Sequence, residues 1–260
     1  MSTTFVTASR HGAVGLIELT RPGKFNALSR PGFDAIGAAL DDFTAPAAGV
    51  RAVLVCAQGP HFCTGGDLDE ANALRADGGL DGFLRHVNAT LLRLEQCPLP
   101  VVAACQGLVL AGGLELSLCC DIVLAAADAR FGDQHVQYGL VPAWGATQRL
   151  PRRIGPLRAI DLMFSGRWVD AQTALQWGLV TQVVDPAQLR EEALRCCTTL
   201  AARSRPGLAA MKRLARAAFA LPLAEGLRLE RETVVDTMAG PDPAEGLAAF
   251  QARRPPRFSA

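Results

Sequence analysis

The 260-residue sequence predicts an α/β fold that ends in a separate helical region. Half of the residues are hydrophobic, which is enough for one large core. Short apolar runs alternate with segments of helical periodicity over most of the chain, and the strand patterns stop near Pro186. We therefore predict a core domain over residues 1–190 and a helical region over residues 191–260.

Five short runs in the core domain are predicted to be strands, because they are apolar and rich in β-branched residues. They span residues 13–19, 51–57, 101–105, 122–125 and 180–184. Helical stretches are expected near residues 32–43, 69–96, 113–120 and 158–165. This alternation predicts that strands pair in parallel through crossover connections.

Beyond Pro186, apolar residues recur at helical spacing. The predicted helices span residues 187–203, 207–220, 223–238 and 243–252. Pro206, Pro222 and Pro241 lie at plausible helix starts. The last eight residues, RRPPRFSA, are expected to be poorly helical.

Charge and composition exclude several classes of partner. Lys and Arg number 26 against 25 Asp and Glu, so no global field favours nucleic acid or an anionic membrane. Residues 1–12 lack the apolar core of a signal peptide, and no apolar stretch has the length of a bilayer span. We therefore expect a cytoplasmic protein with neither a nucleic-acid nor a membrane partner.

Cysteine and histidine spacing argues against disulfide and metal sites. The eight cysteines show no C-x-x-C spacing, so we expect buried, reduced thiols. His11, His61 and His86 have no partner at metal-ligand spacing, and no metal site is predicted.

A first candidate site lies in HFCTGGDLDE (61–70), where a strand leads into two glycines and then an acidic residue that can cap a helix. Glycines let the backbone approach a ligand closely, and the first turn of a helix leaves N–H groups free to bind an anion. An ordinary glycine turn between a strand and a helix is the alternative interpretation.

A second candidate lies in CQGLVLAGGLELSLCCD (105–121), which indicates a strand, a small-residue turn at Ala111-Gly112-Gly113 and a buried helix carrying Glu115. The segment matches neither a dinucleotide fingerprint nor a phosphate loop. Burial of an unpartnered carboxylate costs on the order of several kcal/mol. Glu115 is therefore either a structural hydrogen-bond acceptor or a tuned acid or base.

Two such turns in one domain could aim a pair of N–H donors at a single oxyanion. Together with other segments, they make the sequence resemble the crotonase (enoyl-CoA hydratase/isomerase) superfamily over essentially the whole chain. The matching stretches are LTRPGKFNALS (19–29), HFCTGGDL (61–68), QGLVLAGGLELSLCCDIVLAA (106–126), ARFGDQHVQYGLVPAWGATQRLPRRIG (129–155), SGRWVDAQTALQWGLVTQVV (165–184) and EGLAAFQARRPPRF (245–258).

The resemblance implies a crotonase-type ββα superhelix, or spiral, with a C-terminal helical trimerisation region, assembled as a homotrimer or a dimer of trimers. It also implies an acyl-CoA substrate whose thioester oxygen lies between the N–H groups of Gly66 and Gly112, which stabilise an enolate. Coenzyme A is then part of the substrate, and no further cofactor is expected.

The resemblance assigns the coenzyme A contacts to residues scattered along the chain. These are Lys24, Phe25 and Ala27, the Asp67-Leu68 pair that follows the first oxyanion glycine, and Arg253. The family often has Asp-x-Lys after that glycine, whereas this sequence has Asp67-Leu68-Asp69 and so lacks the lysine. Arg253 matches a basic residue that reaches the coenzyme A of a neighbouring subunit, and a solvated helix end is the alternative.

The reaction type depends on a departure from the family pattern. Hydratases of the family use two glutamates. The first matches Glu115, but the second position, in Phe131-Gly132-Asp133-Gln134-His135, is His135. A neutral imidazole accepts a hydrogen bond from water and its conjugate acid donates a proton, so hydration remains chemically feasible. His135 as a mere polar lining residue, with Glu115 working alone, stays open.

A second departure is PAWGATQRL (142–150), where hydratases have a run of glycines and where Trp144 adds bulk near the acyl pocket. Trp144, Gln134 and Gln137 are compatible with a branched or carboxylated acyl group of the glutaconyl type. The leading hypothesis is an enoyl-CoA hydratase. An isomerase, decarboxylase or hydrolase of the same fold is the alternative among enzymes, and a non-catalytic acyl-CoA binder is the alternative outside them.

Overall fold

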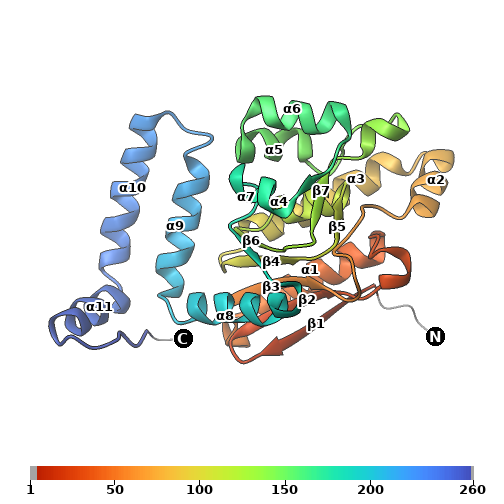
Figure 1. Ribbon diagram of the computed structural model, residues 1–260. Coiled ribbons are helices and arrows are strands. Elements are labelled where there is room, and N and C mark those ends of the chain that lie inside the picture. The colour runs from red at the N-terminus through yellow and green to blue at the C-terminus, as the bar shows by residue number, and fades with distance from the viewer. Residues whose placement is uncertain (1–4, 259–260) are drawn as a thin grey trace.

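The computed structural model describes residues 5–258, and within them one sheet of six strands forms the centre of the molecule (Figure 1). In spatial order these are β1 (Val6–His11), β2 (Val14–Leu19), β3 (Ala52–Ala57), β4 (Val101–Cys105), β6 (Ile122–Ala126) and β9 (Gln182–Val184). All pairs from β2 to β9 are parallel. The five predicted strands and their parallel pairing are confirmed.

Strand β1 was not predicted from the sequence. It pairs antiparallel with β2 at the edge of the sheet, and most of its side chains are exposed. An edge strand of this kind lacks the alternation of apolar and polar residues that marks a half-buried strand, because solvent covers most of it.

A second, smaller sheet contains β5 (Leu108–Leu110), β7 (Arg130–Gly132) and β8 (Val169–Asp170). The chain passes from β4 to β5 through Gly107, whose φ is +53° and whose added Cβ would lie 2.1 Å from the carbonyl oxygen of Pro60. Only glycine fits there. Twice along the chain, at β4–β5 and at β6–β7, one strand lies in the main sheet and the next in the small sheet, and a helix follows.

Seven α-helices follow this path in the described part of the core. They are α1 (Arg30–Thr44), α2 (Leu68–Asp77), α3 (Leu80–Gln96), α4 (Gly112–Leu118), α5 (Ala146–Ile154), α6 (Pro156–Ser165) and α7 (Ala171–Gln176), with short 3₁₀ turns η1 (Pro22–Lys24), η2 (Pro46–Ala48), η3 (His135–Tyr138) and η4 (Pro186–Gln188). The helical stretch expected near residues 69–96 is present and consists of two helices, α2 and α3, because Gly78 adopts a φ of +77° and ends α2.

The C-terminal helices are α8 (Leu189–Ala201), α9 (Arg205–Ala217), α10 (Leu223–Met238) and α11 (Pro241–Gln251). The four predicted helices are confirmed. The predicted boundary between residues 190 and 191 falls inside α8, however, and Leu189, Ala193 and Cys197 of this helix are buried against the main sheet. Figure 1 shows that α9, α10 and α11 stand apart from the sheet. The core therefore continues to the end of α8.

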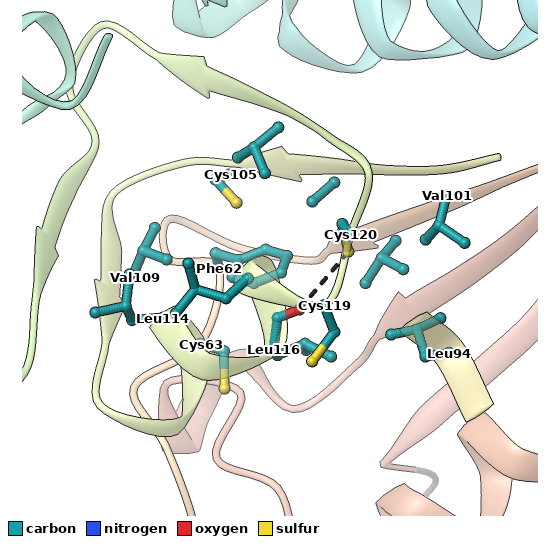
Figure 2. Close-up of a cluster of buried hydrophobic side chains, with 14 of the residues drawn as sticks. Phe62, Cys63, Leu94, Val101, Cys105, Val109, Leu114, Leu116, Cys119 and Cys120 are labelled. Atoms are coloured by element: carbon teal, nitrogen blue, oxygen red, sulfur yellow. Dashed lines mark hydrogen bonds between the residues drawn. The ribbon is translucent and has the colours of Figure 1, made fainter. Parts of the chain in front are cut away.

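All eight cysteines are free, and seven of them are buried. Figure 2 shows Cys63, Cys105, Cys119 and Cys120 among apolar side chains at the centre of the core. Burial raises the pKa of Cys63 and of Cys119 to about 12, because desolvation disfavours a thiolate. The prediction of buried, reduced thiols is confirmed. In residues 5–258, no helix is both long and apolar enough to cross a membrane.

Candidate active site

The first glycine turn is held against the small sheet by backbone hydrogen bonds. The Cys63 N–H donates to the Leu108 carbonyl (3.2 Å), and the Leu110 N–H donates to the Cys63 carbonyl (3.0 Å). A Cβ added to Gly113 would lie 2.0 Å from the Cys63 carbonyl oxygen. The start of α4 therefore packs directly on the segment that precedes the first turn, and only glycine permits this approach.

The N–H groups of Gly66 and Gly112 lie at the junction of these two segments. Gly66 lies opposite Leu28 in an isolated bridge. The Leu28 N–H donates to the Gly65 carbonyl, and the Asp67 N–H donates to the Leu28 carbonyl. The N–H of Gly66 itself takes no part in this bridge. Gly112 is the first residue of α4 and has no intrahelical acceptor. A Cβ added to Gly65 would lie 3.3 Å from the Gly112 nitrogen, so the two turns are neighbours.

The second turn is strained at the residue before the helix. Ala111 has φ +48° and ψ −119°, a conformation that non-glycine residues rarely adopt. Its N–H donates to the Gly132 carbonyl of β7 (2.9 Å). This bond holds the turn in the conformation that starts α4 at Gly112.

The indole of Trp144 covers both glycines from one side. An added Cβ would lie 2.2 Å from its Cζ3 at Gly112 and 3.1 Å from its Cζ2 at Gly66. The ring is 6% exposed and meets the Phe33 ring edge-on, with centroids 4.9 Å apart. Trp144 is therefore a rigid wall beside the two N–H groups.

Glu115 lies in the first turn of α4 and is 1% exposed. Its Oε1 accepts hydrogen bonds from the N–H groups of Trp144 and Ala146, both 2.8 Å long. Its Oε2 is buried and has no hydrogen-bond partner within the described residues. Burial raises the pKa of Glu115 to about 7, although the two N–H donors and the neighbouring His135 oppose the rise. One oxygen is thus structural, and the other is available for chemistry.

His135 begins the η3 turn, and its Nε2 lies 3.9 Å from Oε2 of Glu115. This separation is too long for a direct hydrogen bond. The Nδ1 atom lies 2.9 Å from Oδ1 of Asp133. Burial disfavours the imidazolium, but the hydrogen bond to Asp133 and the carboxylates of Asp133 and Glu115 outweigh it and raise the pKa of His135.

Asp133 is a residue that the sequence interpretation did not single out. It is 1% exposed, and its contact with His135 joins residues two positions apart at the end of β7. The available signal was an acidic residue two positions before the histidine at the matched catalytic position.

The sequence model of the enoyl-CoA hydratase/isomerase family matches residues 9–260 of the chain. The chain belongs to this family. A probable enoyl-CoA hydratase of Rhizobium meliloti is 36% identical over 258 residues, which cover 99% of both chains. The methylglutaconyl-CoA hydratase of Rattus norvegicus mitochondria is 36% identical over 214 residues, which cover 80% of this chain and 68% of that protein. The crystal structure of an enoyl-CoA hydratase from Bacillus anthracis has a TM-score of 0.93 at 31% identity and covers 98% of each chain.

In this enoyl-CoA hydratase/isomerase family member, part of the predicted coenzyme A surface lies beside the first glycine turn. The Phe25 carbonyl accepts from the Thr64 N–H (3.2 Å), and the exposed Phe25 ring stacks on His61 with centroids 5.3 Å apart. Lys24 is exposed, with Nζ 3.8 Å from a carboxylate oxygen of Asp69. Ala27 is half-buried two residues further on. These positions can contact a ligand, and their binding role stays a prediction.

The Asp67-Leu68 pair divides between structure and surface. Asp67 caps α2, and its Oδ2 lies 2.7 Å from Nη1 of Arg21. Burial opposes ionisation of Asp67, yet the Arg21 hydrogen bond and the capped N–H groups keep its pKa below the ordinary value. Leu68 is 69% exposed. The predicted helix cap is confirmed, and Leu68 is the member of the pair that is free to meet a ligand.

Arg253 is not brought to the site of its own chain. It is exposed just beyond α11, which Figure 1 places on the side of the molecule opposite α2. The contact of Arg253 with the coenzyme A of a neighbouring subunit stays a prediction.

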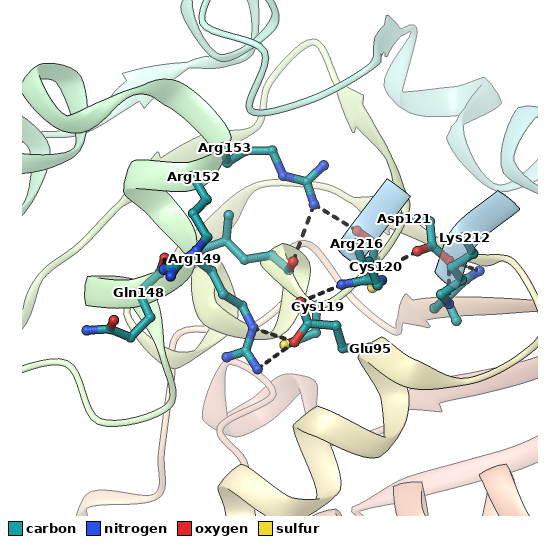
Figure 3. Close-up of polar contacts among 12 residues, drawn as sticks. Glu95, Cys119, Cys120, Asp121, Gln148, Arg149, Arg152, Arg153, Lys212 and Arg216 are labelled. Carbon is teal, nitrogen blue, oxygen red and sulfur yellow. Dashed lines mark hydrogen bonds and ion pairs between the residues drawn. The ribbon is translucent and has the colours of Figure 1, made fainter. Parts of the chain in front are cut away.

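An ionic network holds the 142–146 loop and helix α9 to the core (Figure 3). Arg149 donates to the Trp144 carbonyl (2.9 Å) and to Glu95 (2.9 Å), and Arg216 of α9 pairs with Glu95 and Asp121. The loop supplies the N–H donors of Glu115, so this network supports the site indirectly. Within residues 5–258, no three His, Cys, Asp or Glu side chains group to hold a metal ion.

Proposed function

We propose that the protein is an enoyl-CoA hydratase that adds water across the double bond of a 2-enoyl-CoA thioester. The observation that carries this proposal is the facing pair of Glu115 Oε2 and His135 Nε2, 3.9 Å apart, one helical turn from the Gly112 amide. Two titratable groups with a gap between them suit a reaction that removes a proton from water and delivers another to carbon.

In the proposed reaction the thioester oxygen accepts hydrogen bonds from the N–H groups of Gly66 and Gly112. As water attacks C3, the π electrons of the C2=C3 bond move into the thioester, and its oxygen becomes an enolate oxygen. Each donor contributes about 3 kcal/mol to such a step. Because both are backbone groups on packed turns, they need no reorganisation when the charge develops.

Glu115 and His135 move the protons. The Glu115 carboxylate takes a proton from water as the C3–O bond forms, and the imidazolium of His135 gives its Nε2 proton to C2. Glu115 then holds one proton more and His135 one fewer. Transfer of that proton from Oε2 of Glu115 to Nε2 of His135 restores both groups.

The acyl group is the less specified part of the proposal. Gln134 and Gln137 both donate through Nε2 to the Gly166 carbonyl (2.7 Å), so their amides are engaged within the protein. Trp144 and Phe33 fill the space on one side of the glycines. We propose a compact acyl group, linear or branched, and the relative named methylglutaconyl-CoA hydratase supports including a carboxylated substrate in the test.

Replacement of Trp144 by alanine is expected to change the substrate preference. Removal of the indole opens space beside Gly66 and Gly112, so kcat/KM for an eight-carbon 2-enoyl-CoA should rise relative to that for crotonyl-CoA by about tenfold, since one methylene in a pocket is worth roughly 1 kcal/mol or more. Steady-state kinetics on a chain-length series measure the ratio. Trp177→Ala, a half-buried tryptophan whose ring lies under the guanidinium groups of Arg158 and Arg167, is the control. An unchanged ratio in W144A contradicts the assignment of Trp144 to the acyl pocket.

A single screen tests the reaction type. Crotonyl-CoA, branched and carboxylated 2-enoyl-CoA esters are incubated with the protein in heavy-oxygen water, and the products are resolved by mass spectrometry. Hydration adds one labelled oxygen to the acyl chain, and hydrolysis places the label in the free acid. Decarboxylation lowers the mass by that of carbon dioxide. Isomerisation changes the chromatographic retention time and leaves the mass unchanged. Binding of the esters without turnover identifies the non-catalytic alternative. The proposal fails if no 2-enoyl-CoA gains acyl-chain oxygen.

We further propose that the chain works in the cytoplasm as a homotrimer or a dimer of trimers. Large apolar side chains are exposed along α9, α10 and α11, more than a monomer would leave in water. They are Met211, Phe219, Leu223, Leu227, Val234, Val235, Met238, Leu247 and Phe250. A second and a third copy can cover them.

The assembly proposal predicts a smaller particle when one of these side chains becomes charged. Phe250→Glu, at a side chain that is 83% exposed in the single chain, should lower the mass measured by light scattering, because a buried charge is costly at an apolar interface. Phe250→Leu keeps the surface apolar and should retain the mass. A wild-type protein that elutes as a monomer contradicts the proposal.

A further inference from the structure

We infer that Asp133 is a positioning residue that holds the His135 imidazole with Nε2 directed at Glu115. The catalytic consequence rests on the proposed hydratase function, whereas the orientation of the ring can be tested without it.

One oxygen of Asp133 makes both of the contacts that place His135. Oδ1 accepts from the backbone N–H of His135 (3.2 Å) and meets the ring Nδ1 at 2.9 Å. The first contact sets where the η3 turn begins, and the second sets the rotation of the ring. Asp133 follows Gly132, whose carbonyl accepts from the Ala111 N–H beside Gly112. The same short segment therefore aligns the histidine and the second glycine turn.

The Asp133 contact also selects the tautomer of His135. A carboxylate accepts hydrogen bonds and does not donate them, so Nδ1 must carry a proton. In the neutral ring the lone pair is then on Nε2, and in the imidazolium Nε2 carries the second proton. In both states the atom that accepts or donates the catalytic proton is Nε2, which lies 3.9 Å from Oε2 of Glu115. Without Asp133 the neutral ring can protonate at Nε2 instead, which removes the acceptor from the site.

The charge on Asp133 stabilises the imidazolium form that donates the proton to C2. Asp133 and Glu115 are the charged groups that act on His135 among the described residues, one from the end of β7 and the other from α4. Both are 1% exposed, so solvent screens them little. Oδ1 of Asp133 contacts the ring, and Oδ2 has no hydrogen-bond partner within the described residues.

Nitrogen-15 NMR of the resting protein tests the orientation. His135→Gln assigns the signal of His135 among the four histidines. In the wild type, when the His135 ring is neutral, we expect Nδ1 to be protonated and Nε2 to be unprotonated. In Asp133→Asn we expect the pKa of His135 to fall by about one unit, because a neighbouring anion typically shifts a titration by one unit or more. Asp128→Asn, an exposed acid just before β7, is the control and should leave His135 unchanged.

Kinetics test the catalytic consequence. If hydratase activity is found, D133N should lower kcat at least about tenfold with KM within about twofold, since general acid catalysis contributes 10²-fold or more. The alkaline limb of the pH profile should move about one unit toward lower pH, because His135 loses its proton earlier. The result that overturns the inference is a wild-type ring protonated at Nε2, or a D133N variant whose His135 pKa and alkaline limb match the wild type. Absence of hydratase activity with the expected NMR result contradicts the proposed function and leaves the orientation supported.

Discussion

Glu115→Gln is expected to lower kcat for 2-enoyl-CoA hydration by about 10³-fold, the middle of the range for loss of a general base. The amide keeps an oxygen for the N–H groups of Trp144 and Ala146, so the loop that Glu115 holds should remain in place. What is lost is the basic Oε2 that faces His135. Steady-state assays that follow the absorbance of the enoyl thioester measure the decrease in kcat. Glu192→Gln, at an exposed ion pair with Arg195, is the matched control. Activity within tenfold of wild type would remove Glu115 from the reaction.

The same variant should be more stable than the wild type at alkaline pH. The folded-state pKa of Glu115 is about 7, above its ordinary value of 4.5, so the folded protein binds this proton more tightly than the unfolded chain. The Glu115 contribution to stability is therefore fully present below pH 4.5 and is lost as the pH rises to about 7. At pH 8, the free energy of unfolding of E115Q should exceed that of the wild type by about 3 kcal/mol, and at pH 5 the difference should be small. Urea titrations at both values measure it, and equal stability at pH 8 would contradict the burial argument.

Gly112→Ala is the second change with a large expected effect. The added methyl group would lie 2.2 Å from Cζ3 of Trp144, whose ring is buried against Phe33 and has little room to move. The backbone or the indole must shift, which moves the Gly112 N–H from its place. We expect kcat/KM to fall about 10²–10³-fold, as for loss of an oxyanion donor, together with about 1–3 kcal/mol of stability.

Two further variants separate the clash from a general effect of alanine. Gly82→Ala, on the exposed face of α3 with open space around it, should be neutral or slightly stabilising. In the double variant that combines G112A with Trp144→Ala, the methyl group added at position 112 has no indole to meet, so part of the lost stability should return. If the double variant is no more stable than G112A, the clash with Trp144 is not the cause.

Local patterns were sufficient for most of the fold, because buried parallel strands are continuous apolar runs and helices bury a periodic face. The runs at β3 and β4 are examples. Local patterns were insufficient where an element is short or solvated, as at β1, β8 and α7. They also gave no sign of the break at Gly78, where a single residue with positive φ divides one periodic stretch into two helices.

The candidate site divides in the same way. The glycine turns and Glu115 have local signatures, namely small residues before a helix and a carboxylate in an apolar stretch. The family resemblance added His135 by its position in a motif. Neither source indicated that Asp133 accepts from the His135 ring, or that the backbone of the 142–146 loop binds one oxygen of Glu115 and leaves the other free.

The sequence by itself determined the family, the five parallel strands of the main sheet, the C-terminal helices, and which residue types are available for enolate chemistry. Only the tertiary structure decided how they act together. The amide of Gly66 lies near that of Gly112 because Cys63 pairs with β5. The Trp144 ring covers one side of both glycines because Arg149 holds the loop that carries it. The pKa values of Glu115 and His135 depend on burial and on partners that approach from other elements. Such effects fall off over a few ångströms in space and have no fixed spacing along the chain, so no local pattern contains them.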